Sequence, residues 1–342
     1  MGQDVPHLLA SRRFLPLFLT QFLGALNDNL FKNAMAILIL YALAVGDGAT
    51  GQVLVSLAAM VFILPFFLFS ATAGQLADKV EKAGLVRIVK LCEILVMALG
   101  IVGLLWGNIP FLMAVLFLLG TQSTFFGPLK YGILPVHLAP GELIAGNGLI
   151  EAGTFLAILL GTIVGGLVIL VDGGVIWIAV LTLTAAVGGY ASSRFIPPAP
   201  PVDPGLTVSA NILAETWRTI TRLRDDRVLF LSVLGISWFW LIGVVFLSLF
   251  PAYAKDVLGA DEKVVTLFLT VFSIGIGIGS LLCNKALKGE VSARHVPLGA
   301  LLITLFTFDL VAASPEAPAT ELMGVGAFLN APGSWRILID LA

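Results

Sequence analysis

The stretch GQLADKVEKAGLVR, residues 74–87, lies between two long apolar segments, 51–73 and 85–106. Each segment has the roughly 17–25 residues that an α-helix needs to cross a bilayer. Backbone polar groups in lipid must pair internally, so runs of this length predict helices and not the strands of a barrel. The stretch therefore predicts the polar turn of a transmembrane helical hairpin.

The same pattern recurs along all 342 residues, of which 58% are hydrophobic and 12% charged. The mean hydropathy is +1.03. Soluble domains have about 45–50% apolar and about 25% charged residues, so we expect an all-α integral membrane protein. Its predicted spans are 14–41, 51–73, 85–106, 110–126, 143–171, 174–196, 228–252, 264–284 and 296–313.

The cationic residues fall mainly on one side of these nine spans. Of 19 Lys and Arg, fifteen lie in alternate loops or at the adjoining helix ends, and Lys32 lies inside a span. Lys255, Lys263 and Arg336 fall on the other side. The positive-inside rule then predicts a cytoplasmic N-terminus.

The chain divides at a proline-rich stretch, PPAPPVDPG (197–205), which cannot continue a helix. We expect a six-helix bundle over 1–196, a cytoplasmic linker over 197–227 and a partial second bundle over 228–342. The linker contains an amphipathic helix whose arginines suit an anionic lipid surface. Because a tenth span begins near Trp335, the sequence suggests a C-terminal truncation.

The first span carries polar residues where lipid penalises them. A charge at the bilayer centre costs about 2.5–3.5 kcal/mol on insertion scales, so Asp28 and Lys32, one turn apart, require each other or a polar cavity. Asn29 and Asn33 extend their helical face, which favours a substrate or ion pathway over a structural pair. Asn27, on another face, suits an interhelical hydrogen bond.

Other polar residues add to this candidate pathway. Asn147 and Glu151 lie one turn apart in the fifth span, where Glu151 could pair with Lys32, bind a cation or carry a proton. Lys130 follows the Gly127-Pro128 break, where its ammonium either reaches the headgroups or contacts a substrate phosphate. Glu93 lies three residues after Lys90, and a salt bridge at the membrane interface explains this pair at least as well as a role in the pathway does.

Two motifs resemble those of the major facilitator superfamily. Gly74, Asp78 and Lys79 match its cytoplasmic signature loop, with the later glycine and basic positions displaced to Gly84 and Arg87. In that family the loop acts as a latch for alternating access. The fifth span is similar to the family's glycine motif; the small residues that match, and that permit close helix packing, are Ala157, Gly161, Gly165 and Gly166.

Three further stretches, QFLGALNDNLFKNA (21–34), FFGPLKYGILP (125–135) and NGLIEAGTFLAILLGTIVGG (147–166), resemble the lysophospholipid transporter branch of this superfamily. The whole chain looks most like the transporter domain that some bacteria fuse to an acyltransferase and an acyl-carrier-protein synthetase. The resemblance implies alternating-access transport of lysophosphatidylethanolamine across the bacterial inner membrane for reacylation. Implied partners are the lysophospholipid, membrane lipids and the fused or associated acyltransferase.

The motifs of several enzyme classes are absent from the sequence. Five residues after His7, His137 and His295 stand Arg12, Glu142 and Ala300, so no His-x4-Asp acyltransferase motif occurs. We expect no cofactor, no metal site and no nucleic-acid partner. The rival hypotheses are a proton-coupled carrier for another amphiphile or drug, and a membrane anchor for a fused acyltransferase.

Overall fold

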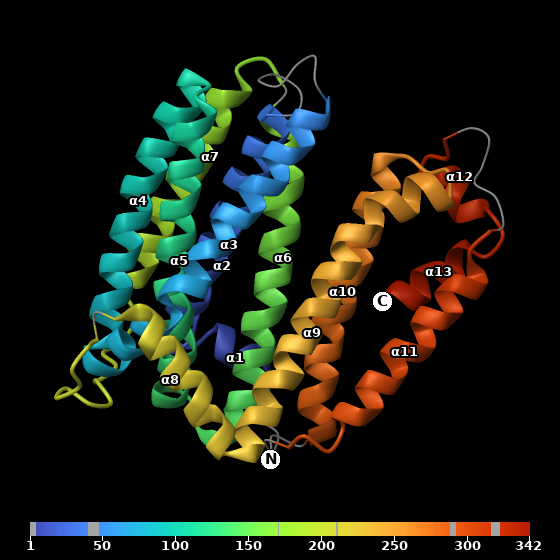
Figure 1. The fold of residues 1–342 in the computed structure, drawn as a ribbon. Coiled ribbons are helices and arrows are strands. Elements are labelled where there is room, and N and C mark those ends of the chain that lie inside the picture. The colour runs from blue at the N-terminus through green and yellow to red at the C-terminus, as the bar shows by residue number, and fades with distance from the viewer. Residues whose placement is uncertain (1–4, 40–47, 170, 210, 288–291, 316–321) are drawn as a thin grey trace. The chain divides into compact units, whose positions relative to one another are not determined.

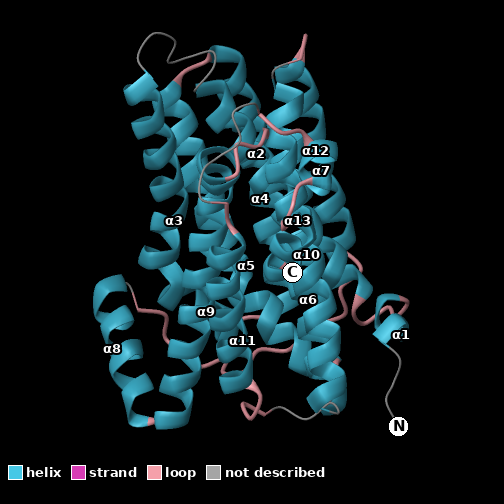
Figure 2. Cartoon of the chain, turned by 90° about the vertical axis from the view of Figure 1, so that its right-hand side faces the viewer, coloured by secondary structure: helices cyan, strands magenta, loops and turns pink. Residues whose placement is uncertain are grey.

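The computed structural model describes residues 5–39, 48–169, 171–209, 211–287, 292–315 and 322–342. Within these ranges the regular elements are helices, and a single bridge between Ala260 and Met323 is the nearest approach to a sheet. Figure 2 shows helices and loops throughout. Three predicted positions lie outside the described residues: the span end at Tyr41, Leu170 in the fifth span, and the cationic residue Lys288.

The first compact unit comprises residues 1–220. Its helices include six long ones that run side by side (Figure 1). In chain order the elements are α1 (Val5–Leu9), α2 (Leu15–Leu38), α3 (Gly48–Lys79), α4 (Lys82–Trp106), α5 (Ile109–His137), the 3-10 helix η2 (Pro140–Glu142), α6 (Leu143–Ile169) and α7 (Gly174–Ser193). The amphipathic helix α8 (Ile212–Asp225) contains the boundary with the second unit.

The second unit comprises residues 221–342. Its elements are α9 (Arg227–Ala252), the π-helix η3 (Tyr253–Val257), α10 (Glu262–Leu287), α11 (Val296–Ala313), α12 (Val325–Asn330) and α13 (Ser334–Leu341). Its core contains a group of aromatic rings, with Phe268 against Phe250 and Phe328. Arg336 on α13 forms a two-point ion pair with Asp309 on α11.

A helix stands at each of the nine predicted spans. In the described residues, seven helices are long and apolar enough to cross a membrane, or up to eight if the bent pair α8 and α9 counts as one. Helix α2 is outside that number because its polar residues lower its hydropathy. The prediction of an all-α, multi-pass membrane protein is therefore confirmed.

The fourth span is longer than predicted. We expected it to end at residue 126, before Gly127-Pro128, yet α5 continues through Pro128 and Pro135 to His137. Proline removes one helical hydrogen bond, and its ring crowds the Cβ of the preceding residue. Gly127 has no Cβ, which relieves this crowding before Pro128; at Pro135 the helix continues although Leu134 precedes it.

Helix α2 lies against α6 because glycines remove the side chains that would separate them. A Cβ added at Gly161 would lie 2.5 Å from the Leu26 carbonyl oxygen, and one at Gly165 would lie 2.4 Å from that of Leu30. A Cβ at Gly166 would lie 2.9 Å from Asn33 Nδ2. The glycine motif thus brings the backbone of α6 onto the polar helix α2.

We predict that Gly165→Ala destabilises the protein, because its methyl group would force α6 away from Leu30. Overpacking of this kind costs about 1–3 kcal/mol, which thermal unfolding of the detergent-solubilised chain would detect as a lower melting temperature. Gly235→Ala on α9, where an added Cβ has no atom within 4 Å, is the matched control. Equal melting temperatures for the two variants would contradict the close approach.

Candidate functional site

Asp28 lies halfway along α2 and faces α5. Ser123 Oγ on α5 donates a hydrogen bond of 2.6 Å to its Oδ2, while its buried Oδ1 accepts none from a described residue. Lys32 forms no ion pair with Asp28 among the described contacts, so the structural pair, the alternative to a pathway, is not seen there. Its ammonium lies 5.0 Å from the ring centroid of Phe62 on α3. The two charges are thus directed at different helices.

The asparagines of α2 also point to different partners. Asn29 donates to the carbonyl of Ala25 in its own helix at 2.8 Å, whereas Asn33 donates to the carbonyl of Thr162 on α6 at 2.6 Å. Each amide thus donates to a backbone carbonyl, and the assignment of both residues to a pathway stays a prediction.

The most buried polar contacts of the unit involve residues that we had not assigned to the pathway. Asn27 Nδ2 donates to Glu93 Oε1 on α4 at 2.8 Å, and Lys90 Nζ lies 2.6 Å from Glu93 Oε2. Both charged side chains are 1% exposed, so the pair is enclosed by other parts of the protein. The Lys90 ammonium also lies 4.5 Å from the centroid of Phe126.

A glycine makes room for this buried ion pair. A Cβ at Gly24 on α2 would lie 2.3 Å from Lys90 Nζ, so the ammonium fills the place where a side chain would be. The sequence signal for this arrangement was the spacing of Lys90 and Glu93 by three residues, one helical turn. Their spacing indicated a pair, but not which neighbouring helix would bury it.

A second polar group joins α5 to α6. Tyr131 donates a short hydrogen bond to Glu151, and the Lys130 ammonium lies 4.7 Å from the Tyr131 ring centroid. Asn147 donates to the carbonyl of Leu143, one turn earlier in its own helix, at 2.8 Å. Glu151 is therefore associated with Tyr131 and not with Lys32.

Away from the charged residues at the helix ends, the carboxylates and ammonium groups of α2, α4, α5 and α6 balance: Asp28, Glu93 and Glu151 against Lys32, Lys90 and Lys130. They influence one another, because Asp28 interacts with Glu93, Lys90 and Lys32, and Lys130 interacts with Glu151 and Lys90. Such a set can bind a headgroup that carries both charges without leaving a net charge in the bundle. The described residues contain no group of three His, Cys, Asp or Glu side chains that could hold a metal ion.

The predicted gate loop contacts the proline-rich connector. The Asp78 carbonyl accepts hydrogen bonds from the backbone of Val202 and Asp203, at 2.8 and 3.0 Å. Gly74 does not mark a close helix approach, since an added Cβ would have no atom within 4 Å. Lys79 ends α3. In these contacts the backbone of Asp78, and not its carboxylate, holds the connector.

Glu81, which the sequence analysis did not single out, ties the loop to the connector more firmly. Its carboxylate caps α4 by accepting from the backbone of Ala83 and Gly84, and it also accepts from the backbone of Ala199 at 2.8 Å. Lys82 adds a bond from its Nζ to the carbonyl of Pro200. The connector is therefore fastened at the turn between α3 and α4.

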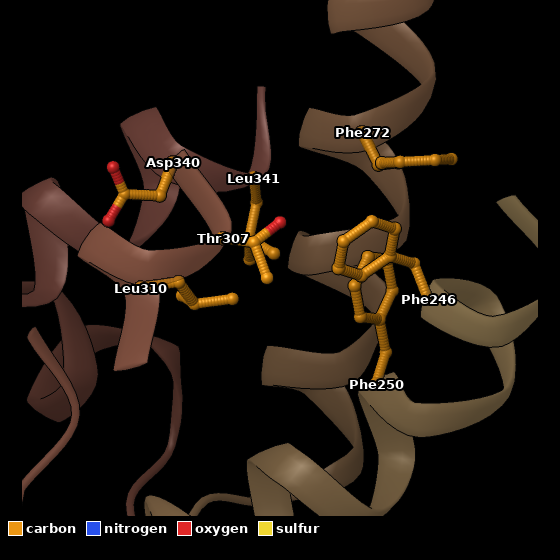
Figure 3. Close-up of a pocket in the computed structure, with 7 residues that line it drawn as sticks. All are labelled: Phe246, Phe250, Phe272, Thr307, Leu310, Asp340 and Leu341. Carbon is orange, nitrogen blue, oxygen red and sulfur yellow. The ribbon is translucent and has the colours of Figure 1, made fainter. Parts of the chain in front are cut away.

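Two hollows lie within the second unit. One, of about 30 Å³, is lined by Phe246, Phe250 and Phe272 opposite Thr307, Leu310, Asp340 and Leu341 (Figure 3). It has room for about two waters and no lipid. The other, of about 440 Å³, is an apolar hollow between α9 and α11. Neither hollow is lined by a cation beside a carboxylate.

The model of the Major Facilitator Superfamily matches residues 17–342. The chain belongs to this superfamily. The resemblance seen in its loop and glycine motifs is thereby confirmed, and so is the helical fold that the resemblance implied.

Curated relatives of this chain are named lysophospholipid transporter LplT. Those of Citrobacter koseri and Salmonella newport are each 29% identical over 328 residues, which is 94% of this chain and 79% or 78% of theirs. Two solved structures share the fold over 96% of this chain. The human organic anion transporter MFSD10 has a TM-score of 0.65 at 13% identity, with 83% of its chain covered. The E. coli fucose:proton symporter FucP has a TM-score of 0.62 at 14% identity, with 79% covered.

We predict that Lys90→Met destabilises the chain by about 3–5 kcal/mol, because it leaves the Glu93 carboxylate buried without its cation. The double variant Lys90→Met with Glu93→Gln removes both charges and keeps an acceptor for Asn27, so it recovers most of the loss. Thermal unfolding in detergent measures both.

The Arg13–Glu142 pair serves as the control for this measurement. Its side chains are 38% and 8% exposed, against 1% each for Lys90 and Glu93, so this pair lies nearer to water and Arg13→Met costs less. Equal losses in the Lys90 single and double variants would show that charge burial is not the cause.

A further prediction concerns Glu81 and pH. Burial raises the pKa of Glu81, but its bonds to the backbone of Ala199, Gly84 and Ala83 lower it more, so the net pKa lies below its usual 4.5. The stabilisation is then complete above about pH 4.5 and is lost as the pH falls through the lower folded value.

Hydrogen exchange at the Ala199 amide, corrected for intrinsic rates, tests this clamp. We expect protection at pH 7 that declines at pH values below 4.5, and faster exchange at pH 7 in Glu81→Gln. Asp203→Asn is the control, because its carboxylate bonds only within its own turn, to Gly205 among the described residues. Unchanged protection in Glu81→Gln would exclude the clamp.

Proposed function

We propose that this protein is a lysophospholipid transporter that moves lysophosphatidylethanolamine-type lipids across the bacterial inner membrane. The observation that carries the proposal is the 29% identity to transporters of that name over 94% of the chain. Membership of the superfamily over residues 17–342 supports transport and not catalysis.

The polar residues of the first unit suit the substrate. A lysophosphatidylethanolamine headgroup carries a phosphate and an ammonium, which require a cation and a carboxylate. Lys130 and Glu151 supply both on adjacent helices, and Lys32 and Asp28 supply both on α2. In our proposal these four side chains, with Asn29, Asn33 and Asn147, line the pathway, and the single acyl chain follows apolar helix faces.

The rest of the proposal concerns topology. The N-terminus is placed in the cytoplasm because fifteen of the 19 Lys and Arg then lie on or near the cytoplasmic side. The bundle of 1–196, the linker of 197–227 and the helices of 228–342 act as separate parts in alternating access, with Gly74, Asp78 and Lys79 in the gate loop. A fused or associated acyltransferase then reacylates the transported lipid.

We predict that Asp28→Asn lowers transport by about 10- to 100-fold, because the hydrogen bond from Ser123 loses its charged acceptor. The assay follows fluorescent lysophosphatidylethanolamine across the membrane of proteoliposomes that contain the full chain. Asp172→Asn, which changes an exposed carboxylate after α6, is the control and should transport normally.

The outcomes separate function from site. If the unaltered protein moves no lysophosphatidylethanolamine, the substrate is wrong, and a proton-coupled carrier for another amphiphile or a membrane anchor becomes the better hypothesis. If the unaltered protein moves the lipid and Asp28→Asn moves it at the same rate, the function stands and the assignment of Asp28 fails.

A further inference from the structure

Helix α8 exposes apolar and basic side chains together. Trp217 is 64% exposed and Ile220 is 39% exposed. Arg222 and Arg224, on the same helix, are exposed as well. An exposed tryptophan among arginines is typical of the membrane–water interface, where an indole ring lies at headgroup level.

Length and direction indicate that α8 does not span the membrane. Its 14 residues extend about 21 Å, less than the roughly 30 Å of a hydrocarbon core. The chain bends by 116° between α8 and α9 at Asp226, whose side chain caps α9 by accepting from Val228 and Leu229. A helix that meets a spanning helix at such an angle runs along the membrane surface.

The charges of this segment leave an excess of arginine. The Glu215 carboxylate is 10% exposed and is held by Arg218 and by Gln75 of α3. Arg222, Arg224 and Arg227 form no ion pair with any residue that the structure describes. The exposed surface of α8 therefore has the charge that complements an anionic lipid leaflet.

We propose that α8 lies in the plane of the bilayer and binds the headgroups of anionic phospholipids. Trp217 and Ile220 enter the interfacial layer, and Arg222 and Arg224 contact lipid phosphates. A lipid surface suits this helix better than a protein partner because α9 enters the membrane directly after Asp226. The proposal is independent of which lipid or solute the protein transports.

One side chain connects this helix to the gate loop. Gln75, in the last turns of α3, donates from Nε2 to Glu215 Oε2 at 2.8 Å and accepts at Oε1 from the backbone of Ser209 at 3.1 Å. Gln75 lies three residues before Asp78. A lipid-bound α8 would thus hold the end of α3 in place.

The test uses the full chain with Cys92→Ser and Cys283→Ser, and one new cysteine that carries a fluorescent label. Ile220→Cys reports the apolar side of α8, and Thr219→Cys, about 100° around the helix from it, is the matched control. Each is reconstituted into vesicles of phosphatidylcholine alone or mixed equally with phosphatidylglycerol, then exposed to aqueous iodide and to a lipid-borne quencher.

We expect the label at residue 220 to be quenched from the lipid and the label at residue 219 from water, with a larger difference when phosphatidylglycerol is present. Arg222→Gln with Arg224→Gln should reduce that difference, by about fivefold in the bound-to-free equilibrium for each arginine. Arg294→Gln, an exposed arginine before α11, should leave it unchanged.

Two results would overturn the proposal. One is equal iodide quenching at residues 219 and 220 in phosphatidylglycerol vesicles. The other is protection of residue 220 that is the same in detergent as in vesicles, which would mean that protein covers it. The comparison between the two vesicle types needs no arginine variant, so it remains decisive if the double variant fails to fold.

Discussion

The first bundle depends on one constraint: a charge inside the membrane requires a partner, and the partner fixes which helices meet. Lys90 and Glu93 of α4 satisfy each other at 2.6 Å, and Asn27 of α2 completes the group. The arrangement requires that α2 lack a side chain at Gly24, where the ammonium lies. This buried group therefore links α2 to α4 through side chains, at Asn27 and at Gly24.

The polar residues of α2 act as links in several directions. Asn27 bonds to α4, Asp28 to α5 and Asn33 to α6, while Lys32 lies over a ring of α3. A helix with such links on several sides has to be central to its bundle. The same centrality explains the glycines of α6, which remove the side chains that would hold Leu26 and Leu30 at a distance.

At the turn between α3 and α4, hydrogen bonds to backbone groups, and not a buried ion pair, hold the connector. The connector is rich in proline and so has few backbone N–H donors. The amide of Ala199 donates to the Glu81 carboxylate, and the amides of Val202 and Asp203 donate to the Asp78 carbonyl. Gln75 accepts from the backbone of Ser209 before α8 and donates to the Glu215 side chain on α8. The signature loop, the connector and the amphipathic helix thus form one bonded system.

By itself, the sequence determined the helical membrane fold, the positions of the spans and the superfamily, because hydropathy and short motifs are local properties of the chain. It also indicated that Asp28, Lys32 and Lys90 needed partners. Only the tertiary structure decided which partners they have. Helical spacing placed Asp28 beside Lys32, but side chains one turn apart can turn to different helices, and here they do, toward Ser123 and Phe62. Burial of the Lys90–Glu93 pair likewise depends on Gly24, 66 residues before Lys90, and no local pattern joins residues so far apart.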